Sequence, residues 1–439
     1  MRILSITAGA AGMYCGSCLR DNALAAELLA RGHEVTLLPL YTPTLTDEAN
    51  VSTPDRVLFG GVSVYLEQHL GLFRHTPRWL DRLWDSPAAL RVLARQSVNT
   101  DPRMLGELTI SMLKGEEGRQ RKEFEKMREW LQSEPAPDVV NLPNTLLIAL
   151  AAPLGQALGR PICCTLQGED LFIEGLPDQY RAQALDLIRG QLHHVELFIA
   201  VSDFYRHRMI DYVGIPPDRV AVVPLGINVS GYDAVPRRQN QVFTIGFFAR
   251  VAPEKGLHEL CEAYSLLRRE FGVEARLEVA GYLGREHRPY FERLQTTMHA
   301  QGFEADFRYH GELTRDEKIA FLRSVDVLSV PGPFPDPKGM YLLEAMAAGT
   351  PVVQPRRGAY PEVIAKTGGG IVVDEGPRAL AEGLVQLHRD VSLRRRLGDA
   401  GAAGVRAHYA IARSADQLLG VYQRLLPRNT APVELTRVG

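Results

Sequence analysis

The sequence predicts an α/β protein made of two doubly wound, Rossmann-like domains that face each other across a cleft. Short apolar runs alternate with helical patterns in both halves of the 439 residues. Such runs are typical of parallel strands that are covered by helices on both faces. The length exceeds what one ordinary core accommodates. A polar, turn-rich segment that begins at Val229, VSGYDAVPRRQNQ, separates the two series of strands and is typical of a linker.

The first series begins with ILSIT at Ile3. A glycine-rich turn, GAAGMYCGS, joins this strand to a predicted helix, DNALAAELLARG, which ends at Gly32. The later predicted strands are HEVTLLPLY, DVVNLPN, RPICCTLQG, LFIAVS and RVAVVPLG. The start of the chain also has the pattern of a signal peptide, but the turn and amphipathic helix that follow at once favour a first strand.

Residues 42–137 interrupt this series and carry little strand pattern. They include a charged helical stretch, GEEGRQRKEFEKMREWLQ, and all three tryptophans, Trp79, Trp84 and Trp130. We expect a helical insertion in the first domain. Its tryptophans and its LGLF stretch leave three roles open: packing of a helical subdomain, stacking on an acceptor sugar, and peripheral contact with a membrane.

The second series begins at Val242, and its final helix, SADQLLGVYQRLL, follows the last strand. The predicted strands are VFTIGFFAR, RLEVAGY, DFRYHGEL, VDVLSVPG, TPVVQP and GGIVVD. We expect an N-terminal domain over 1–235, a second domain over 236–410, and a helix and tail over 411–439. Ligands of such sheets bind at the carboxyl ends of the strands, so the cleft is the expected binding region.

Composition narrows the classes of function. The net charge is −2 with acids and bases interspersed, which predicts no general attraction to nucleic acid. The five cysteines lack the spacing of a disulfide framework, which favours a reducing, cytoplasmic location. The longest apolar run, TLLIALAAPLGQAL from Thr145, is too short to span a bilayer.

The first loop can bring backbone close to a phosphate, although a tight turn without a ligand remains an alternative. It does not match G-x-G-x-x-G or a P-loop, and the second strand ends at Tyr41, not at an acid, which disfavours nicotinamide dinucleotides and P-loop ATP hydrolysis. Cys15 and Cys18 form a C-x-x-C inside this loop. A redox pair or half of a metal site is conceivable, but no second motif has zinc spacing, so we expect two reduced thiols and no metal.

Two segments carry charges suited to a nucleotide. In FFARVAPEKG, Arg250 and Lys255 flank the start of a helix, as a diphosphate site requires, although ordinary solvated charges are the alternative. In DPKGMYLLEAMAAG, the N–H groups of residues 338–341 can bind an anion. We expect Glu344, in the first turn of the helix, to hold a ribose or merely to favour the helix dipole, and Asp336 to face the group attached to the phosphate.

Taken together, these segments resemble the retaining GT-B glycosyltransferases of family 4, also called glycosyl transferases group 1. The resemblance covers nearly the whole chain outside 42–137. It rests on the first loop and the helix ending RGHEV, on TLQGED, VSDFYRHRMIDYVGIPPDRVAVVPLGIN and ARVAPEKG, and on the carboxylate–seven–Glu motif followed by AMAAGTPVV and YPEVI. It implies that the last helix crosses back to the first domain.

The resemblance also implies a site. Arg250 and Lys255 would bind the donor diphosphate, Glu344 the ribose, and the segment RYHGEL the base. The donor-binding positions are Gly12, Tyr309, Gly311, Glu312, Lys338, Gly339, Met340, Tyr341 and Glu344, and the catalytic ones are Arg250, Lys255, Asp336 and Gln167. The chain departs from the family at Asp336, usually Glu, at Lys338, usually aromatic, and at Gln167, often His. These three positions face the transferred sugar in the family.

We therefore expect a metal-independent hexosyltransferase that transfers a sugar, with retention, from a nucleoside diphosphate sugar to a carbohydrate, lipid or small-molecule acceptor. A UDP-sugar is the preferred donor. The alternatives are a nucleotide-sugar epimerase, a phosphorylase, or a non-catalytic nucleotide-sugar-binding protein. Gln167 cannot take up a proton near neutral pH and is expected to orient a sugar hydroxyl. Glu169 and Asp170 are competing bases, or a charge pair at the start of a helix.

Overall fold

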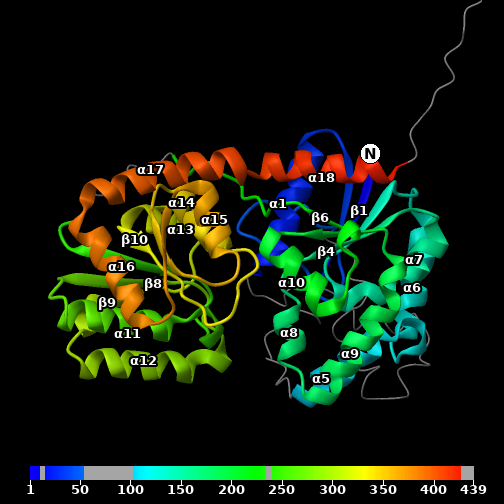
Figure 1. Ribbon diagram of the computed structural model, residues 1–439. Helices are drawn as coiled ribbons and strands as arrows, with labels where there is room; N and C mark the ends of the chain where they lie inside the picture. The colour runs from blue at the N-terminus through cyan, green and yellow to red at the C-terminus, as the bar shows by residue number, and fades with distance from the viewer. Residues whose placement is uncertain (10–14, 54–101, 234–239, 427–439) are drawn as a thin grey trace, which may run out of the picture.

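The computed structural model describes residues 1–9, 15–53, 102–233 and 240–426 (Figure 1). Gly12, Trp79, Trp84 and the LGLF stretch lie outside these ranges.

Two six-stranded parallel sheets form the described part of the chain, which confirms the predicted fold class. The first sheet has the order β2-β1-β3-β4-β5-β6 and the second β12-β11-β10-β7-β8-β9. The strands of the first sheet are β1 (Arg2–Thr7), β2 (Glu34–Pro39), β3 (Val139–Leu142), β4 (Ile162–Leu166), β5 (Leu197–Ala200) and β6 (Val220–Val222). Those of the second are β7 (Phe243–Phe248), β8 (Ala275–Ala280), β9 (Phe307–Tyr309), β10 (Val327–Leu328), β11 (Val352–Pro355) and β12 (Gly370–Val373).

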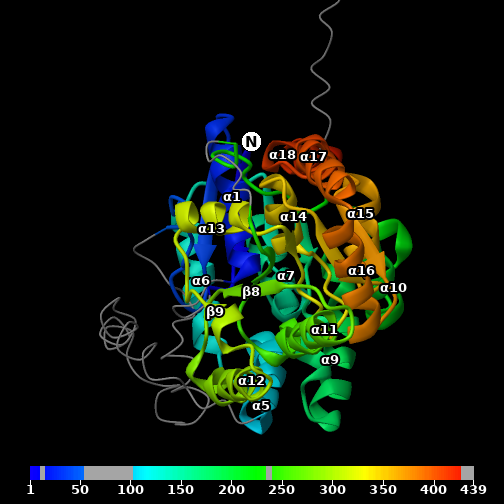
Figure 2. The same ribbon diagram turned by 90° about the vertical axis from the view of Figure 1, so that its left-hand side faces the viewer.

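Helices cover both faces of each sheet, which explains why most strands are largely apolar. Leu4 and Ile6 of β1 pack in the core on one face of the first sheet, and Ile3 packs on the other. In the second domain, β8 and β9 lie between α11 and α12 on one side and α13 and α14 on the other (Figure 2).

The helices of the first domain are α1 (Gly16–Ala30), α5 (Pro102–Leu113), α6 (Arg121–Ser133), α7 (Ala151–Leu158), α8 (Asp170–Glu174), α9 (Asp178–Gln191) and α10 (Asp203–Val213). Those that follow are α11 (Leu257–Arg269), α12 (Arg288–Ala300), α13 (Arg315–Ser324), α14 (Met340–Ala347), α15 (Tyr360–Thr367), α16 (Pro377–Arg389), α17 (Val391–His408) and α18 (Ile411–Leu425).

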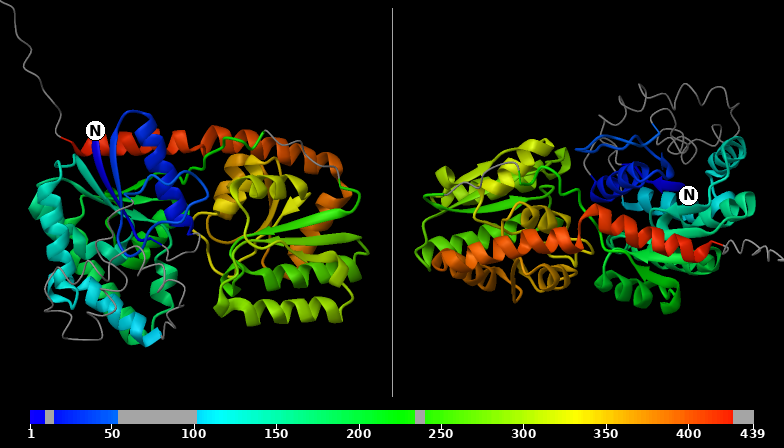
Figure 3. Two further views of the ribbon diagram at one scale, coloured as in Figure 1. Left: turned by 180° about the vertical axis from the view of Figure 1, so that it is seen from behind. Right: turned by 90° about the horizontal axis from the view of Figure 1, so that it is seen from above.

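The last helix lies on the first domain. Seen from above, α17 and α18 run in succession across both domains (Figure 3). Leu418 and Tyr422 of α18 share a buried cluster with Leu24 and Leu28 of α1. The chain thus passes between the domains twice, at residues 224–228 and at 409–411, and the two passages are joined by hydrogen bonds of 2.8 Å between Ile227 and the backbone of Tyr409 and Ile411.

The starts of α1 and α6, like that of α14 in the site, differ from the sequence prediction. Helix α1 begins at Gly16 and not at Asp21, so Cys15 is its N-cap and Cys18 lies in its first turn, not in a loop. The predicted charged helix begins only at Arg121, after a short 3-10 turn. In this helix Trp130 is 9% exposed and packs in the core of the first domain, so the packing role applies to this tryptophan.

Candidate active site

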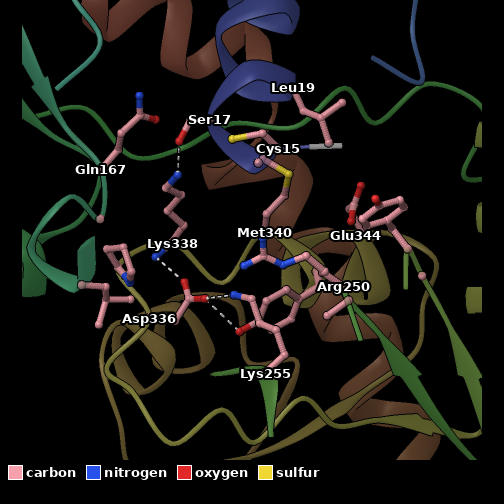
Figure 4. Close-up of a pocket in the computed structure, with 18 of the residues that line it drawn as sticks. Cys15, Ser17, Leu19, Gln167, Arg250, Lys255, Asp336, Lys338, Met340 and Glu344 are labelled. Carbon is pink, nitrogen blue, oxygen red and sulfur yellow. Dashed lines mark hydrogen bonds and ion pairs between the residues drawn. The ribbon is translucent and has the colours of Figure 1, made fainter. Parts of the chain in front are cut away.

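A cavity of about 600 Å³ lies between the two domains at the carboxyl ends of their strands. Its lining comes from both domains, as the family resemblance implies. The predicted site residues that line it are Gln167, Arg250, Lys255, Glu312, Asp336, Lys338, Met340, Tyr341 and Glu344, most of which are labelled in Figure 4. Three other predicted residues do not line the cavity: Tyr309, Gly311 and Gly339. Gly12 lies outside the described residues.

Asp336 is the centre of a dense hydrogen-bond network. Its Oδ1 accepts from the backbone N–H groups of Lys338 and Gly339, both at 2.9 Å. Its Oδ2 accepts from Lys255 Nζ at 2.8 Å and from the Tyr341 hydroxyl at 3.1 Å (Figure 4). The carboxylate therefore links the segment that contains Lys255 to the segment that leads into α14, and it accepts hydrogen bonds from two backbone N–H groups just before that helix.

The ionisation of Asp336 follows from this network. Burial by itself would raise the pKa of its carboxyl. The charge and hydrogen bond of Lys255, together with the two N–H groups, more than offset burial and hold the pKa of Asp336 well below its usual range. Asp336 is thus an anion at any physiological pH and cannot donate a proton.

Helix α14 begins at Met340, directly after Gly339, whose N–H group donates to Asp336. Gly339 is its N-cap, with a φ of 61° that favours glycine. The N–H groups of Met340 and Tyr341 belong to the first turn, where a helix leaves its N–H groups without intrahelical partners. Four N–H groups, those of residues 338–341, were predicted to bind an anion. Those of Lys338 and Gly339 donate to Asp336, so those of Met340 and Tyr341 remain for a ligand.

Glu344 lies one turn further along α14 than predicted. It is the fifth residue of the helix, not part of its first turn, because α14 begins at Met340. Its Oε1 accepts from Lys318 Nζ at 2.7 Å, and Lys318 also pairs with Asp47 of the first domain. Burial raises the pKa of Glu344, and the charge of Lys318 opposes that effect. This ion triad crosses the cleft beside the predicted ribose position.

Arg250 and Lys255 approach the cavity from the end of β7. Arg250 follows the strand and pairs with Glu254, and Lys255 ends a short 3-10 turn, Pro253–Lys255. Gly256, with a φ of 74°, then starts α11, and a Cβ there would lie 2.3 Å from the carbonyl oxygen of Pro331. The tight packing of Gly256 holds the preceding residue, Lys255, at the N-terminus of α11.

The predicted base-binding segment forms one end of the cavity. Glu312 lines it, and burial raises the pKa of this carboxyl. Tyr309 lies behind, where its hydroxyl donates to the Gly281 carbonyl at 2.8 Å. The Gly311 carbonyl accepts from the Gly281 N–H at 2.8 Å. Tyr309 and Gly311 therefore support Gly281 and Tyr282, which do line the cavity and were not predicted.

Gln167 faces the cavity from the end of β4. Its Nε2 donates to the Pro143 carbonyl at 2.8 Å, and the side chain is 4% exposed. Its Oε1 is buried and has no hydrogen-bond partner among the described residues. An unpaired buried acceptor is costly, so a hydroxyl group that reached this oxygen would form a favourable hydrogen bond.

Glu169 has its lone pairs occupied. Its Oε2 accepts from the N–H groups of Gln167 and Gly168, at 2.8 and 3.0 Å, and its Oε1 from the backbone and hydroxyl of Thr145, both at 3.2 Å. Asp170 accepts from Tyr205 and Arg208 and does not line the cavity. Both carboxylates therefore anchor the loop that carries Gln167.

We expect Glu169→Gln to lower the free energy of unfolding by about 1.5–3 kcal/mol, because an amide N–H₂ would replace an oxygen that accepts from N–H groups. The pH profile of turnover is expected to keep both limbs, because both oxygens of the carboxylate already accept hydrogen bonds from the protein. Chemical denaturation and a pH–rate series measure the two effects. Glu174→Gln, at an exposed position of α8, is the matched control. Loss of one limb in Glu169→Gln alone would show that Glu169 is the base.

Sequence analysis did not assign several cavity residues to the site. Two of them are Ser17, whose Oγ lies 2.6 Å from Nζ of the predicted residue Lys338, and Cys15, which lines the same wall (Figure 4). Lys318 and Asp47 were missed because nothing in an amphipathic helix or a polar loop marks a charge as buried. Ser17 and Cys15 were within reach of sequence reasoning, since they adjoin the first loop.

Within the described ranges, no cluster of three or more His, Cys, Asp or Glu side chains is arranged to hold a metal ion. In the same part of the chain, no helix has the length and apolarity needed to cross a membrane.

The comparison with known families decides the assignment. Residues 232–403 match the family model of glycosyl transferases group 1, and residues 110–230 match that of Glycosyltransferase Family 4. Together the two matches cover more than half of the chain. The chain belongs to this family of glycosyltransferases. The carboxylate–seven–Glu motif of this glycosyltransferase, Asp336 to Glu344, lies inside the first of the two matched segments.

Sequence relatives of the glycosyltransferase agree with the family models. It is 33% identical over 230 residues to a phosphatidyl-myo-inositol mannosyltransferase of Mycobacterium leprae, a match covering 51% of this chain. It is 29% identical over 249 residues to the putative colanic acid biosynthesis glycosyltransferase WcaL of Escherichia coli, a match covering 55% of this chain. The chain spans 58% of the length of each relative.

Solved structures show that the fold is GT-B. Sucrose-phosphate synthase from Thermosynechococcus elongatus aligns with a TM-score of 0.70 at 16% identity, over 96% of this chain and 98% of that one. Anabaena HepE in complex with UDP aligns with a TM-score of 0.65 at 17% identity, over 97% of this chain and 100% of that one.

Proposed function

We propose that this glycosyltransferase moves a hexose, with retention at the anomeric carbon, from a UDP-sugar to an acceptor in the cleft. The observation that carries the proposal is the convergence of Arg250, Lys255 and the first turn of α14 on one cavity that also contains Glu344. Two cations and free N–H groups suit a diphosphate, and a carboxylate one helical turn away suits a ribose diol. Anabaena HepE binds UDP and UDP-glucose, which favours uridine as the nucleoside.

In this account the site lowers the barrier by stabilising the leaving group. Negative charge that develops on the departing diphosphate is met by Arg250, Lys255 and the N–H groups of Met340 and Tyr341. Lys255 is held in place by Asp336 at 2.8 Å, so its position does not depend on substrate. Preorganised donors of this kind cost no reorganisation at the moment of reaction.

The proton of the acceptor needs a destination. Gln167 cannot take it up, Asp336 is held as a weakly basic anion by Lys255, and Glu169 has its lone pairs occupied. The departing phosphate oxygen is therefore the proton acceptor in our proposal. The Oε1 of Gln167 accepts a hydrogen bond from a sugar hydroxyl and orients the ring.

The acceptor side of the cavity is apolar. Leu171 and Phe172 of α8 line it and are 36% and 38% exposed. An acceptor with an apolar part would cover them.

Three other functions are compatible with the same donor pocket. An epimerase would return a changed nucleotide sugar, and a phosphorylase would give a sugar phosphate. A binding protein would hold the donor without product. We favour transfer because the cavity extends past the donor contacts to Gln167 and the apolar residues of α8.

Calorimetric titration of the wild-type chain with UDP, GDP and ADP tests the donor assignment without a known acceptor. We expect UDP to bind and to be preferred over the purine nucleotides. Failure of all three to bind would contradict the proposed donor site.

We also expect activity to be independent of added metal, because Arg250, Lys255 and helix N–H groups supply the positive charge near the diphosphate. The slow hydrolysis of a UDP-sugar by the protein should be unchanged after treatment with EDTA and desalting. A loss that Mg²⁺ or Mn²⁺ restores would contradict the cation-based account.

A further inference from the structure

The C-x-x-C of this chain lies at a helix N-terminus inside the cleft. Cys15 is the N-cap of the 15-residue helix α1, and Cys18 is in its first turn with 1% of its surface exposed. Cys15 is half-buried and lines the cavity. The N-terminus of a helix favours negative charge, and low-pKa cysteines of exchange motifs occupy such positions.

A cation from the other domain faces this motif. Lys338 extends from the segment before α14, and its Nζ lies 2.6 Å from Ser17 Oγ, next to Cys15 (Figure 4). A hydrogen bond from Cys18 and the charge of Lys338 lower the pKa of the Cys15 thiol well below its usual range, although burial opposes them. The lowered pKa favours the thiolate form at Cys15 rather than at Cys18.

Asp21 provides a buried carboxylate on the same helix as the Cys18 thiol. Thr7 Oγ1 donates to Cys18 Sγ at 3.8 Å, and Asp21 lies one helical turn after Cys18 with 4% of its surface exposed. Oδ1 of Asp21 accepts from Arg20 at 2.9 Å, whereas its Oδ2 is buried and lacks a hydrogen-bond partner in the part of the chain that the structure describes. Burial raises the pKa of Asp21, which makes it a better proton acceptor.

We propose that Cys15 and Cys18 form a thiol–disulfide exchange site in the wall of the cleft, and that low-molecular-weight disulfides oxidise it. The thiolate of Cys15 attacks one sulfur of the external disulfide, which releases one thiolate and leaves a mixed disulfide on Cys15. Cys18 then gives its proton to Asp21, and its sulfur attacks that of Cys15. The second external thiolate leaves, so one disulfide is reduced to two thiols while the pair loses two electrons.

The C-x-x-C has the placement that thiol–disulfide exchange motifs use. Cys15 is extended at the N-cap of α1 and Cys18 lies in the first turn. Closing the ring must bring their Cβ atoms to about 3.5–4.5 Å, which the extended N-cap residue can do without unwinding α1. Oxidation would replace a thiolate beside Lys338 by a neutral disulfide in the cavity wall. The site itself does not depend on which sugar the enzyme transfers.

The three other cysteines provide internal controls. Cys163 and Cys164 lie in β4 with none of their surface exposed, and Cys261 of α11 is 5% exposed. Burial raises the pKa of all three thiols. A reagent that reaches the folded protein should therefore distinguish them from Cys15.

The test exposes the reduced full-length protein to glutathione disulfide at pH 7 and counts thiols after denaturation. We expect two of the five thiols to be lost, and the tryptic peptide over residues 3–20 to lose two hydrogens. Retention of all five thiols, a glutathione that stays on Cys15, or loss at Cys163, Cys164 or Cys261 would overturn the proposal.

Two variants separate the steps. Cys18→Ser should stop at a mixed disulfide on Cys15, and Cys15→Ser should lose no thiol. Oxidation of Cys15→Ser at the wild-type rate would overturn the proposed order. If either variant folds poorly, the wild type alone decides: iodoacetamide should alkylate Cys15 at least tenfold faster than the other four cysteines, and equal rates would overturn the proposal.

Discussion

Lys318→Met is expected to lower the free energy of unfolding by about 3–5 kcal/mol, the cost of removing one partner from a buried ion pair. The Lys318 side chain is 5% exposed and pairs with Glu344 and Asp47, whose side chains are 9% and 10% exposed. Methionine keeps the volume but leaves two carboxylates buried side by side without the ammonium group that pairs with both. Equilibrium denaturation in urea measures the change.

An exposed ion pair provides the control for Lys318→Met. Arg31 and Asp416 join α1 to α18, and the Asp416 side chain is 59% exposed. Asp416→Ala should cost less than about 1 kcal/mol, as exposed pairs do. Equal losses in the two variants would show that the Lys318 triad is not an important contributor to stability.

The pH dependence of the Lys318 contribution has a definite sign. Burial lowers the pKa of Lys318, but Glu344, Tyr232 and Asp47 raise it further than burial lowers it. A lysine whose pKa is raised on folding stabilises the protein fully below its unfolded pKa of about 10.4. This stabilisation should therefore persist through neutral pH and decline only as the pH rises above that value.

Lys255→Ala is expected to weaken the binding of free UDP by about 1.5–3 kcal/mol, or roughly 10- to 150-fold, the range for hydrogen bonds to charged groups. The substitution removes one of the two predicted diphosphate cations. It also leaves Asp336 in the cavity wall without its ion pair, and that uncompensated charge repels a diphosphate. Calorimetric titration of the variant with UDP measures the loss.

Lys366→Ala is the matched control for Lys255→Ala. Lys366 is an exposed lysine on α15 of the same domain and does not line the cavity. We expect its UDP affinity to equal that of the wild type. If Lys255→Ala binds UDP as tightly as Lys366→Ala does, the diphosphate lies elsewhere.

The sequence alone was sufficient for the parts of the site that lie on one chain segment. The ends of β7 and β10 are marked by apolar strands followed by glycine and charge, and Arg250, Lys255 and Asp336 could be placed from that pattern. The cleft-facing position of Gln167 could be predicted because the TLQG segment ends a buried strand, whereas its departure from the family was recognised only through the resemblance. Local order in the chain carries such information directly.

Pairings between segments could not be read in this way. The contacts of Lys318 with Asp47 and of Lys338 with Ser17 depend on how two domains pack, and no periodicity encodes that. The start of α1 was misplaced because glycine, cysteine and serine are weak helix formers, so propensity predicted a loop. The start of α14 was placed too late in the sequence. The left-handed Gly339 and the hydrogen bond from its N–H to Asp336 end the loop there, so the helix already begins at Met340.

The most direct test of retaining transfer from a UDP-sugar follows the anomer of the sugar released when no acceptor is present. The wild-type protein would be incubated with UDP-glucose and other UDP-hexoses, and the first product observed by proton NMR before the anomers equilibrate. We expect release of UDP together with the free sugar in the anomeric configuration of the donor. Release of the opposite anomer, of a sugar 1-phosphate, or of an epimerised nucleotide sugar would contradict it.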